Sequence, residues 1–228
     1  MGDTSNVTVT MTPVKSSRAG ASRKEQARTT ALRIVRAAHT LFIERGYTGT
    51  RMADVADAAG VAVQTVYFRF HTKAELLHAC YELAVLGEDD PRPPMEQAWF
   101  AMFVSARSGP AAIRAFAEGN TGIATRVGQL DDIVRSAVHE PEAVEVRRRS
   151  EQLRRDGYRQ MLQSLHDRFG LRDGLDVQRG TDLLLAFGGT ALWRSLVVEY
   201  GWTTEDFVGL LTDVLCDQLL PPRRRRAR

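Results

Sequence analysis

The sequence contains few of the residues from which redox, metal and hydrolytic sites are built. Its only cysteines are Cys80 and Cys216, which are far apart and lie in apolar helical patterns. We therefore expect buried thiols in place of a disulfide, with a redox switch as the alternative. The five histidines are scattered, and no His-Glu-x-x-His, phosphate-loop or nucleophile-elbow spacing occurs. We expect no catalytic residue, metal ligand or cofactor, which leaves an enzyme on a helical scaffold as a remote alternative.

Long apolar runs and a strong net charge are also missing. The uninterrupted hydrophobic stretches fall well short of the roughly 18 residues that span a bilayer, and the threonine-rich start has no signal-peptide core. We therefore expect no membrane partner and a cytoplasmic location. The formal charge of +3 proves nothing about nucleic acid by itself, because the distribution of charge matters more than its sum.

What the sequence does contain is apolar residues at helical spacing, and no segment alternates as a strand does. The clearest helices lie between residues 33 and 77. The first has an apolar face and should end at Gly46 in a left-handed C-cap; that face consists of Ile34, Val35, Ala38, Leu41 and Phe42. Thr50 should cap the second helix, which should end at Gly60. The inner face of that helix consists of Met52, Val55, Ala56 and Ala59.

A third short helix over residues 63–70 can bury only Val66 and Phe70. Its other side stays free and carries hydrogen-bonding, cationic and aromatic groups: Gln64, Thr65, Phe68 and Arg69, with Val63 and Tyr67 at the margins. A major groove about 12 Å wide accepts one helix, and such side chains pair with base edges or contact thymine methyl groups. The segment therefore predicts a helix that reads double-stranded DNA. A compact helical corner with a solvated polar face is the alternative.

The start of a fourth helix predicts a phosphate contact. Thr72 and Glu75 have the Thr-x-x-Glu spacing of a capping box. Lys73 lies at the same helix start, where free backbone N–H groups favour anions.

Together these residues resemble the DNA-binding domain of the tetracycline-repressor (TetR) family. The resemblance rests on the order and spacing of residues 33–38, 41–42, 45–47, 50, 55–56, 59–61, 65–67 and 73–77. It implies that Thr65 and Tyr67 contact DNA and that Lys73 holds a phosphate. It also implies that Thr50 and Arg51 touch the DNA backbone.

The resemblance is incomplete at the third helix. Gln64 and Phe68 fall at positions where family members vary their base readout. Ala62 stands where many members have a serine or threonine that caps this helix, a loss that costs up to roughly 1 kcal/mol.

Beyond Gly87 the sequence predicts further helices, separated by proline and glycine. They are expected over residues 95–105, 111–126, 131–138 and 141–169, then over 177–200 after a cap at Asp176, and from a cap at Thr203 to the prolines at 221–222. The expected fold is all-α, with an N-terminal three-helix helix-turn-helix DNA-binding domain that a fourth helix joins to a C-terminal helical ligand-binding and dimerisation domain. We expect a flexible basic arm at 1–24, the DNA-binding domain at 25–71, the effector and dimerisation domain at 72–220, and a basic tail at 221–228.

The last two expected helices are apolar on more than one face, which predicts a homodimer formed through them. A dimer would place two recognition helices on an inverted-repeat operator. Large side chains between residues 95 and 200 could line a pocket for an effector, although each could equally be ordinary core. They are Trp99, Phe100, Phe103, Phe116, Tyr158, Met161, Phe187 and Trp193.

The expected function is thus a repressor that a small, largely apolar effector releases from its operator. A regulator without a small effector, controlled by a protein partner or constitutive, remains the alternative. Activation of transcription is as open as repression, because which of the two occurs depends on where the operator lies relative to the promoter.

Overall fold

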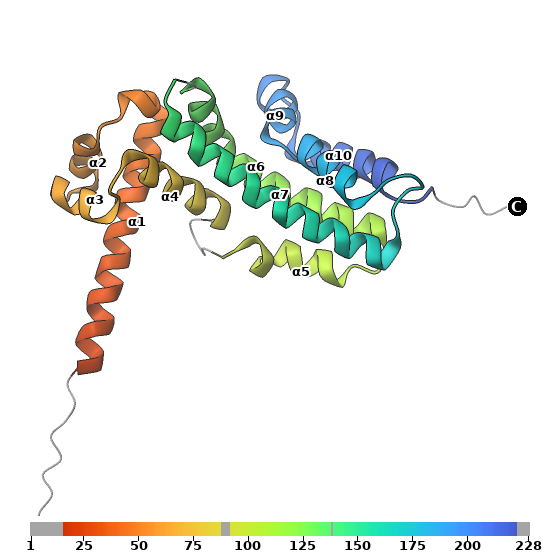
Figure 1. The fold of residues 1–228 in the computed structure, drawn as a ribbon, viewed down its shortest axis with the longest axis horizontal. Helices are drawn as coiled ribbons and strands as arrows, with labels where there is room; N and C mark the ends of the chain where they lie inside the picture. The colour runs from red at the N-terminus through yellow and green to blue at the C-terminus, as the bar shows by residue number, and fades with distance from the viewer. Residues whose placement is uncertain (1–15, 88–91, 138, 223–228) are drawn as a thin grey trace, which may run out of the picture.

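The computed structural model of the protein describes residues 16–87, 92–137 and 139–222, with side chains from residue 24 onward. Every regular element within these ranges is helical, which confirms the all-α prediction. Figure 1 shows a small helical unit at one end, and a longer bundle that extends from it toward the C-terminus.

The small unit is built from α1 (Ser16–Gly49), α2 (Met52–Ala59), α3 (Val63–Arg69) and the start of α4 (Lys73–Leu86). All the apolar residues predicted for the inner faces of α1 and α2 are buried in one core. Gly60 ends α2 at φ 63° and ψ 43°, a left-handed conformation that a residue with a Cβ rarely adopts. The end of α2 at Gly60 is the one that the sequence predicts.

Two features of α1 differ from expectation. The helix begins at Ser16, so residues 16–24 are helical instead of part of a flexible arm; the rest of that expected arm lies outside the described residues, as does most of the basic tail. Gly46 interrupts the helix at φ 71° and ψ 173°. Its φ is positive as predicted, but its ψ is extended, so it is a kink and not a left-handed cap.

The longer bundle is centred on two antiparallel helices, α6 (Gly109–Ser136) and α7 (Pro141–Phe169). In Figure 1, α5 lies along one edge of this pair, and α8 and α10 lie along the other. The remaining elements are η1 (Pro94–Glu96), α5 (Ala98–Ser105), α8 (Val177–Phe187), α9 (Thr190–Trp193), the π-helix η2 (Arg194–Glu199) and α10 (Thr204–Leu219).

The sequence divided the bundle helices incorrectly at two places. The helices expected over residues 111–126 and 131–138 are one helix, α6, because Gly128 in the expected gap is a packing position against the Trp193 ring and not a break. The helix expected over 177–200 instead ends at Phe187, and the chain turns at Gly188 and Gly189 before α9. Asn120 stabilises this turn by donating from Nδ2 to the Gly188 carbonyl, 2.9 Å away.

Within the described residues, Val177–Glu199 is long and apolar enough to cross a membrane by length and composition. The turn at Gly188 and Gly189 divides this stretch among α8, α9 and η2. Only 28% of its most apolar window is buried in the protomer, and many of the other residues are half-buried against the bundle core.

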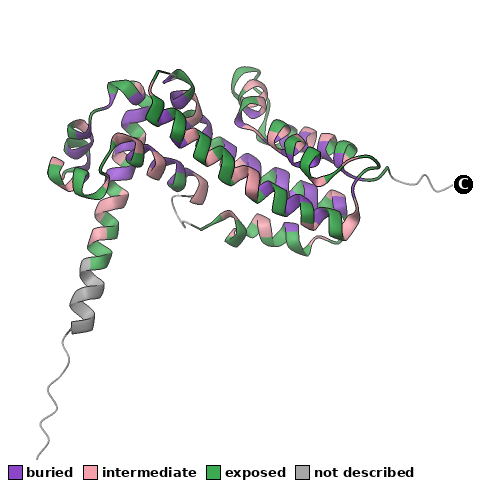
Figure 2. Ribbon diagram, in the orientation of Figure 1, coloured by how far each residue is buried: buried purple, intermediate pink, exposed green. Residues whose placement is uncertain are grey.

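Side chains pack in two cores, and Figure 2 shows buried positions along the facing sides of the helices. One core joins the small unit to α4 and the C-terminal half of α6. The other fills the bundle. Cys80 is buried in the first core, Cys216 is half-buried instead of buried, and the two are not joined by a disulfide. Burial raises the pKa of the Cys80 thiol, which disfavours the reactive thiolate.

We predict that the same substitution has opposite effects at two helical glycines. In Gly119→Ala the new Cβ would lie 2.1 Å from the Trp99 ring, so overpacking should lower the free energy of unfolding by about 1–3 kcal/mol. In Gly157→Ala the Cβ would meet nothing within 4 Å, and the gain in helix propensity should raise that free energy by about 0.5–1 kcal/mol. Urea denaturation measures both values, and equal effects would contradict the packing role of Gly119.

Candidate functional site

Helix α3 presents the side predicted to read DNA. Val66 is fully buried and fixes the rotation of the helix against the core. Gln64 and Arg69 are exposed, as are Tyr67 and Phe68, whose exposed fractions are 50% and 79%. Val63 and Thr65 are half-buried at the edge of this face. Phe68 is a large apolar side chain that the protein leaves almost uncovered. An exposed phenylalanine of this kind favours a binding surface over a helical corner with a solvated polar face.

The turn before α3 is held by a residue whose part in it sequence reasoning missed. Ala62 is the N-cap of α3, and no side chain caps this helix. Instead, the guanidinium of Arg33 in α1 donates to the Ala59 carbonyl and to the Gly60 carbonyl, the latter at 3.2 Å. In the sequence Arg33 was only the first residue of the stretch that resembles the TetR family, since nothing in the spacing pairs it with residues 59–60.

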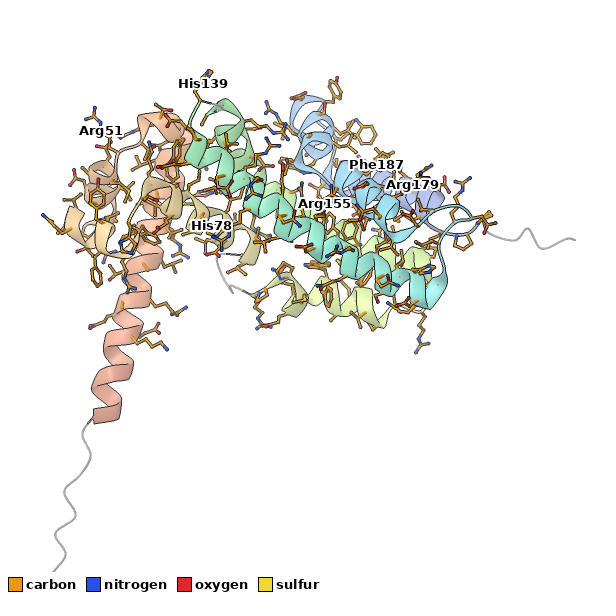
Figure 3. All side chains as sticks on the ribbon, in the orientation of Figure 1. Arg51, His78, His139, Arg155, Arg179 and Phe187 are labelled. Atoms are coloured by element: carbon orange, nitrogen blue, oxygen red, sulfur yellow. The ribbon has the colours of Figure 1, made fainter. Side chains whose placement is uncertain are left out.

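Thr50 does not have the role that was expected. Its side chain is 1% exposed, and its hydroxyl donates to the carbonyls of Leu41 at 3.1 Å and Gly46 at 2.8 Å. The N-cap of α2 is Arg51, without a side-chain hydrogen bond. Thr50 is therefore neither a helix cap nor a side chain available to DNA, because the kink at Gly46 brings acceptors within its reach. Arg51 is exposed and points away from the core (Figure 3).

The start of α4 has the predicted cap. The Thr72 hydroxyl accepts from the Glu75 N–H at 3.1 Å, and the Glu75 carboxylate accepts from the His71 N–H at 3.1 Å. Lys73 donates from Nζ to the Tyr47 carbonyl at 2.9 Å and lies 4.2 Å from the centre of the Tyr47 ring. These contacts fix the ammonium at the junction of α1 and α4, with N–H groups left for a phosphate.

The large side chains proposed for an effector pocket share one core, but they do not surround an open pocket. The apolar cavity in this core has a volume of about 10 Å³, which is about the space of one water molecule. Phe103, Phe116 and Met161 line it. Tyr158 packs edge-on against Phe116, with ring centres 5.2 Å apart. The other expected residues, Trp99, Phe100, Phe187 and Trp193, pack around the same core.

A larger hollow lies elsewhere, between α6 and the α9–η2 segment, with a volume of about 190 Å³. Most of its lining residues are polar or charged, and Arg194 pairs there with both Asp132 and Glu199. None of the side chains proposed for the effector lines it.

Polar side chains connect the bundle core to α4, and sequence reasoning missed them. The Tyr158 hydroxyl donates to Asn120, whose amide donates to Gly188 as described above. Just past that turn, the Thr190 hydroxyl donates to the Asp131 carboxylate, which also accepts from the Tyr81 hydroxyl of α4 at 2.9 Å. Burial and the Asp131 charge raise the pKa of Tyr81, so its hydroxyl stays protonated as the donor.

The C-terminal end of α4 is also anchored to the bundle. Arg126 of α6 donates to the carbonyls of Ala84 at 2.7 Å and Val85 at 3.3 Å. Gln97 donates to the Val85 and Leu86 carbonyls, each at 3.3 Å. Isolated polar residues in a sequence carry no signal for such contacts, because they join elements far apart along the chain.

Comparison with known proteins agrees with this geometry. Residues 34–80 match the family model described as bacterial regulatory proteins of the tetR family. Over 56 residues the chain is 43% identical to the HTH-type transcriptional regulator TtgR of Pseudomonas putida. That match covers 25% of this chain and spans about a quarter of the relative, 27% of its length.

Solved structures extend the likeness in fold to the bundle. NalD of Pseudomonas aeruginosa, described as the secondary repressor of the MexAB-OprM multidrug efflux pump, superposes with a TM-score of 0.63 at 19% identity, covering 88% of this chain and 100% of NalD. A Rhodococcus sp. protein described as a TetR-family transcriptional regulator gives a TM-score of 0.62 at 20% identity, covering 82% and 96% of the two chains. The fold and the α2–α3 pair define a helix-turn-helix protein. With the family model matched across that pair, residues 34–80 form a DNA-binding domain of the tetR family.

We predict that two substitutions separate phosphate binding from base reading. Lys73→Ala should weaken binding to every DNA sequence and lower the slope of log affinity against log salt by about 1, because one phosphate contact is lost. Gln64→Ala should relax preference at particular base pairs. Titration of labelled duplexes at several salt concentrations measures both effects, and Gln163→Ala in the bundle is the control. If the two variants lost affinity in the same way, the assigned roles would be wrong.

Proposed function

We propose that this protein is a cytoplasmic, sequence-specific DNA-binding regulator that represses transcription as a homodimer on an inverted-repeat operator. The observation that carries the proposal is the exposed face of α3, with Gln64, Tyr67, Phe68 and Arg69 free while Val66 anchors the helix. Aromatic and amide groups on a fixed helix suit thymine methyl groups and base edges in a major groove. Lys73 and Arg51 flank this face as phosphate contacts. The role is one of binding, and no enzymatic activity is proposed.

The dimer rests on apolar surface that the protomer leaves uncovered. The Val177–Glu199 stretch and α10 carry half-buried apolar side chains at their outer edges, among them Leu192, Leu196 and Cys216. Val198 and Tyr200 are 60% and 71% exposed. Pairing these elements with those of a second copy would remove this surface from water. A two-fold axis would then set two α3 helices one DNA turn apart, which requires an inverted repeat.

Release by a small, largely apolar effector follows from the way the bundle is joined to α4. An effector that entered the core beside Phe116 and Tyr158 would have to widen a cavity of about 10 Å³. That change would displace Asn120, the turn at Gly188 and the Thr190–Asp131–Tyr81 contacts that hold α4. An effector shifts the protein only if it binds the displaced geometry more tightly. We propose repression in place of activation because NalD, which has a similar fold, is described as a repressor.

Selection of bound sites from random duplex DNA by the purified full chain at physiological salt tests the function. The expected result is an enriched inverted repeat, since a dimer presents two equivalent reading helices. A panel of apolar compounds, titrated against the complex with that repeat, then tests release. An enriched repeat that no compound releases would favour the regulator without a small effector. Absence of any enriched sequence would contradict the proposal.

We predict that Tyr81 and Thr190 act as a unit in setting operator affinity. Tyr81→Phe and Thr190→Val each remove one hydrogen bond to Asp131, so their effects should be non-additive by at least about 0.5 kcal/mol, a factor of about 2 in affinity. The dissociation constant of the operator complex for the two single variants and the double variant gives this coupling energy. Thr212→Val, which removes a hydroxyl that bonds only within α10 to the Val208 carbonyl, should be additive with Tyr81→Phe. If the effects of Tyr81→Phe and Thr190→Val on the dissociation constant were also additive, the proposed coupling of Tyr81 and Thr190 through Asp131 would be wrong.

A further inference from the structure

Helix α7 packs in both cores, and its first turns belong to the core of the small unit. Ala143 is fully buried and Val146 is 8% exposed, and both lie in the core that also contains Tyr47. Farther along the helix, Met161 and Leu165 lie in the bundle core. In Figure 1 the corner between α6 and α7 lies beside the end of α1. The bundle thus meets the small unit at this α6–α7 corner, residues 139–146, as well as at α4.

One hydrogen bond joins the α6–α7 corner to the end of α1. The Thr48 hydroxyl donates to the Glu140 carboxylate at 3.2 Å. Glu140 is the N-cap of α7, but its side chain does not cap that helix. Its backbone is held on both sides, since its N–H donates to the Ala137 carbonyl at 2.9 Å and its carbonyl accepts from the Ala143 N–H at 3.0 Å. The Glu140 carboxylate is thus fixed at the corner and bonded to another element of the fold.

Tyr47, the residue before Thr48, holds Lys73. Its carbonyl accepts from Lys73 Nζ at 2.9 Å, and its ring centre lies 4.2 Å from the same atom. The Tyr47 side chain stacks on Phe42, with ring centres 5.8 Å apart. Gly46 interrupts α1 directly before Tyr47, so the regular part of the helix does not by itself fix where Tyr47 lies. Contacts beyond the helix must therefore help to hold Tyr47 and, with it, the Lys73 ammonium.

The charge of the α6–α7 corner is negative near the Tyr47 ring. Burial, followed by the charges of Glu142 and Glu140, raises the pKa of Tyr47 to about 12. The hydroxyl therefore stays protonated at physiological pH, and the neutral ring can face the Lys73 ammonium. Carboxylates at the corner would repel a DNA phosphate. The corner is thus unsuited to bind DNA itself, and a benefit to DNA binding must come through the residues that it holds.

Positioning matters for a lysine because its ammonium ends a flexible four-carbon stem. Ordering such a side chain on a phosphate costs conformational entropy, unless the protein has already ordered it. Tyr47 orders Lys73 with one hydrogen bond and one ring contact. An ammonium has three N–H donors, so donors remain for a phosphate.

We propose that the α6–α7 corner positions Lys73 for a DNA phosphate: Glu140 holds Thr48, and the adjoining Tyr47 holds the ammonium. This inference rests on the proposed DNA binding, and it adds three positioning residues that do not themselves touch DNA. It also gives the bundle a second connection to the small unit, separate from the contacts of Asp131. Because α7 lines the apolar cavity as well, a shift of this helix in the bundle would reach Lys73 through the corner.

A double-mutant cycle on affinity for the inverted repeat that the wild-type chain selects tests the positioning. Thr48→Val keeps the shape of an exposed side chain but removes its hydroxyl, and circular dichroism would check that the variant folds. It should weaken binding at least about threefold, and it should weaken the Lys73→Ala variant no further. The slope of log affinity against log salt should fall toward that of Lys73→Ala. Thr40→Val, which removes a hydroxyl that bonds within α1 to the Arg36 carbonyl, should change neither affinity nor slope.

Two substitutions at Glu140 separate its charge from its hydrogen bond. Glu140→Gln and Glu140→Ala both remove the negative charge, but only glutamine keeps an oxygen that can accept from Thr48. Glu140→Gln should therefore bind the repeat at least about threefold more tightly than Glu140→Ala. In the Lys73→Ala background the two variants should bind equally, because there is no ammonium left to position.

Three results would overturn the inference while the DNA-binding function stands, since in each the wild-type chain still binds its repeat. One is an effect of Thr48→Val that adds in full to that of Lys73→Ala, which would mean that Thr48 acts on DNA by another route. The second is equal binding of the two Glu140 variants when Lys73 is intact. The third is wild-type affinity in Lys73→Ala. A wild-type chain that selects no sequence would contradict the function itself and the inference with it.

Discussion

Helix α6 contributes buried side chains to both cores, and this shared packing constrains the rest of the structure. Its N-terminal half places Ile113 and Phe116 in the bundle core, and its C-terminal half places Leu130 and Val134 in the core around α1 and α4. Protein interiors are packed too densely to absorb a displacement at one point without movement elsewhere. A shift of α6 in the bundle must therefore be felt at the α4 junction.

Hydrogen bonds from α6, like its buried side chains, join the bundle to α4. Asn120, Arg126 and Asp131 lie along the helix in that order, and they contact the turn at Gly188, the end of α4, and Thr190 with Tyr81. Buried polar contacts of this kind specify one arrangement of the elements because each would be costly to leave unpaired. The proposed effector acts on the contacts of Asn120. The proposed DNA-reading helix α3 lies in the small unit, beyond the contacts of Asp131 with α4.

The sequence predicted best where a local rule decides the structure. The helical stripes of α1 and α2, the end of α2 at Gly60 and the Thr72–Glu75 cap depend on residues a few positions apart, and the structure has each of them. The direction of the α3 face followed from the burial of Val66. The contact of that face with DNA stays a prediction.

Prediction failed where a distant residue overrides a local rule. Thr50 looked like a helix cap, but the kink at Gly46 brings carbonyl acceptors to its hydroxyl. Gly128 falls in the gap expected between two helices, but the helix continues through it and the Trp193 ring occupies the space of its missing side chain. The residues expected to line a pocket pack in one core, and the small size of the cavity there depends on how they interlock. Interlocking of this kind leaves no periodicity in a sequence.

The uncapped start of α3 has a consequence for how this protein can change. Because Arg33 of α1 and the backbone of the Gly60 turn hold the beginning of the helix, the residues that read DNA are not also those that keep the helix in place. Substitutions at Gln64 or Phe68 can then alter which bases are preferred while the scaffold stays intact. Single substitutions at exposed positions can therefore adapt this protein to a new operator sequence without first destabilising the fold.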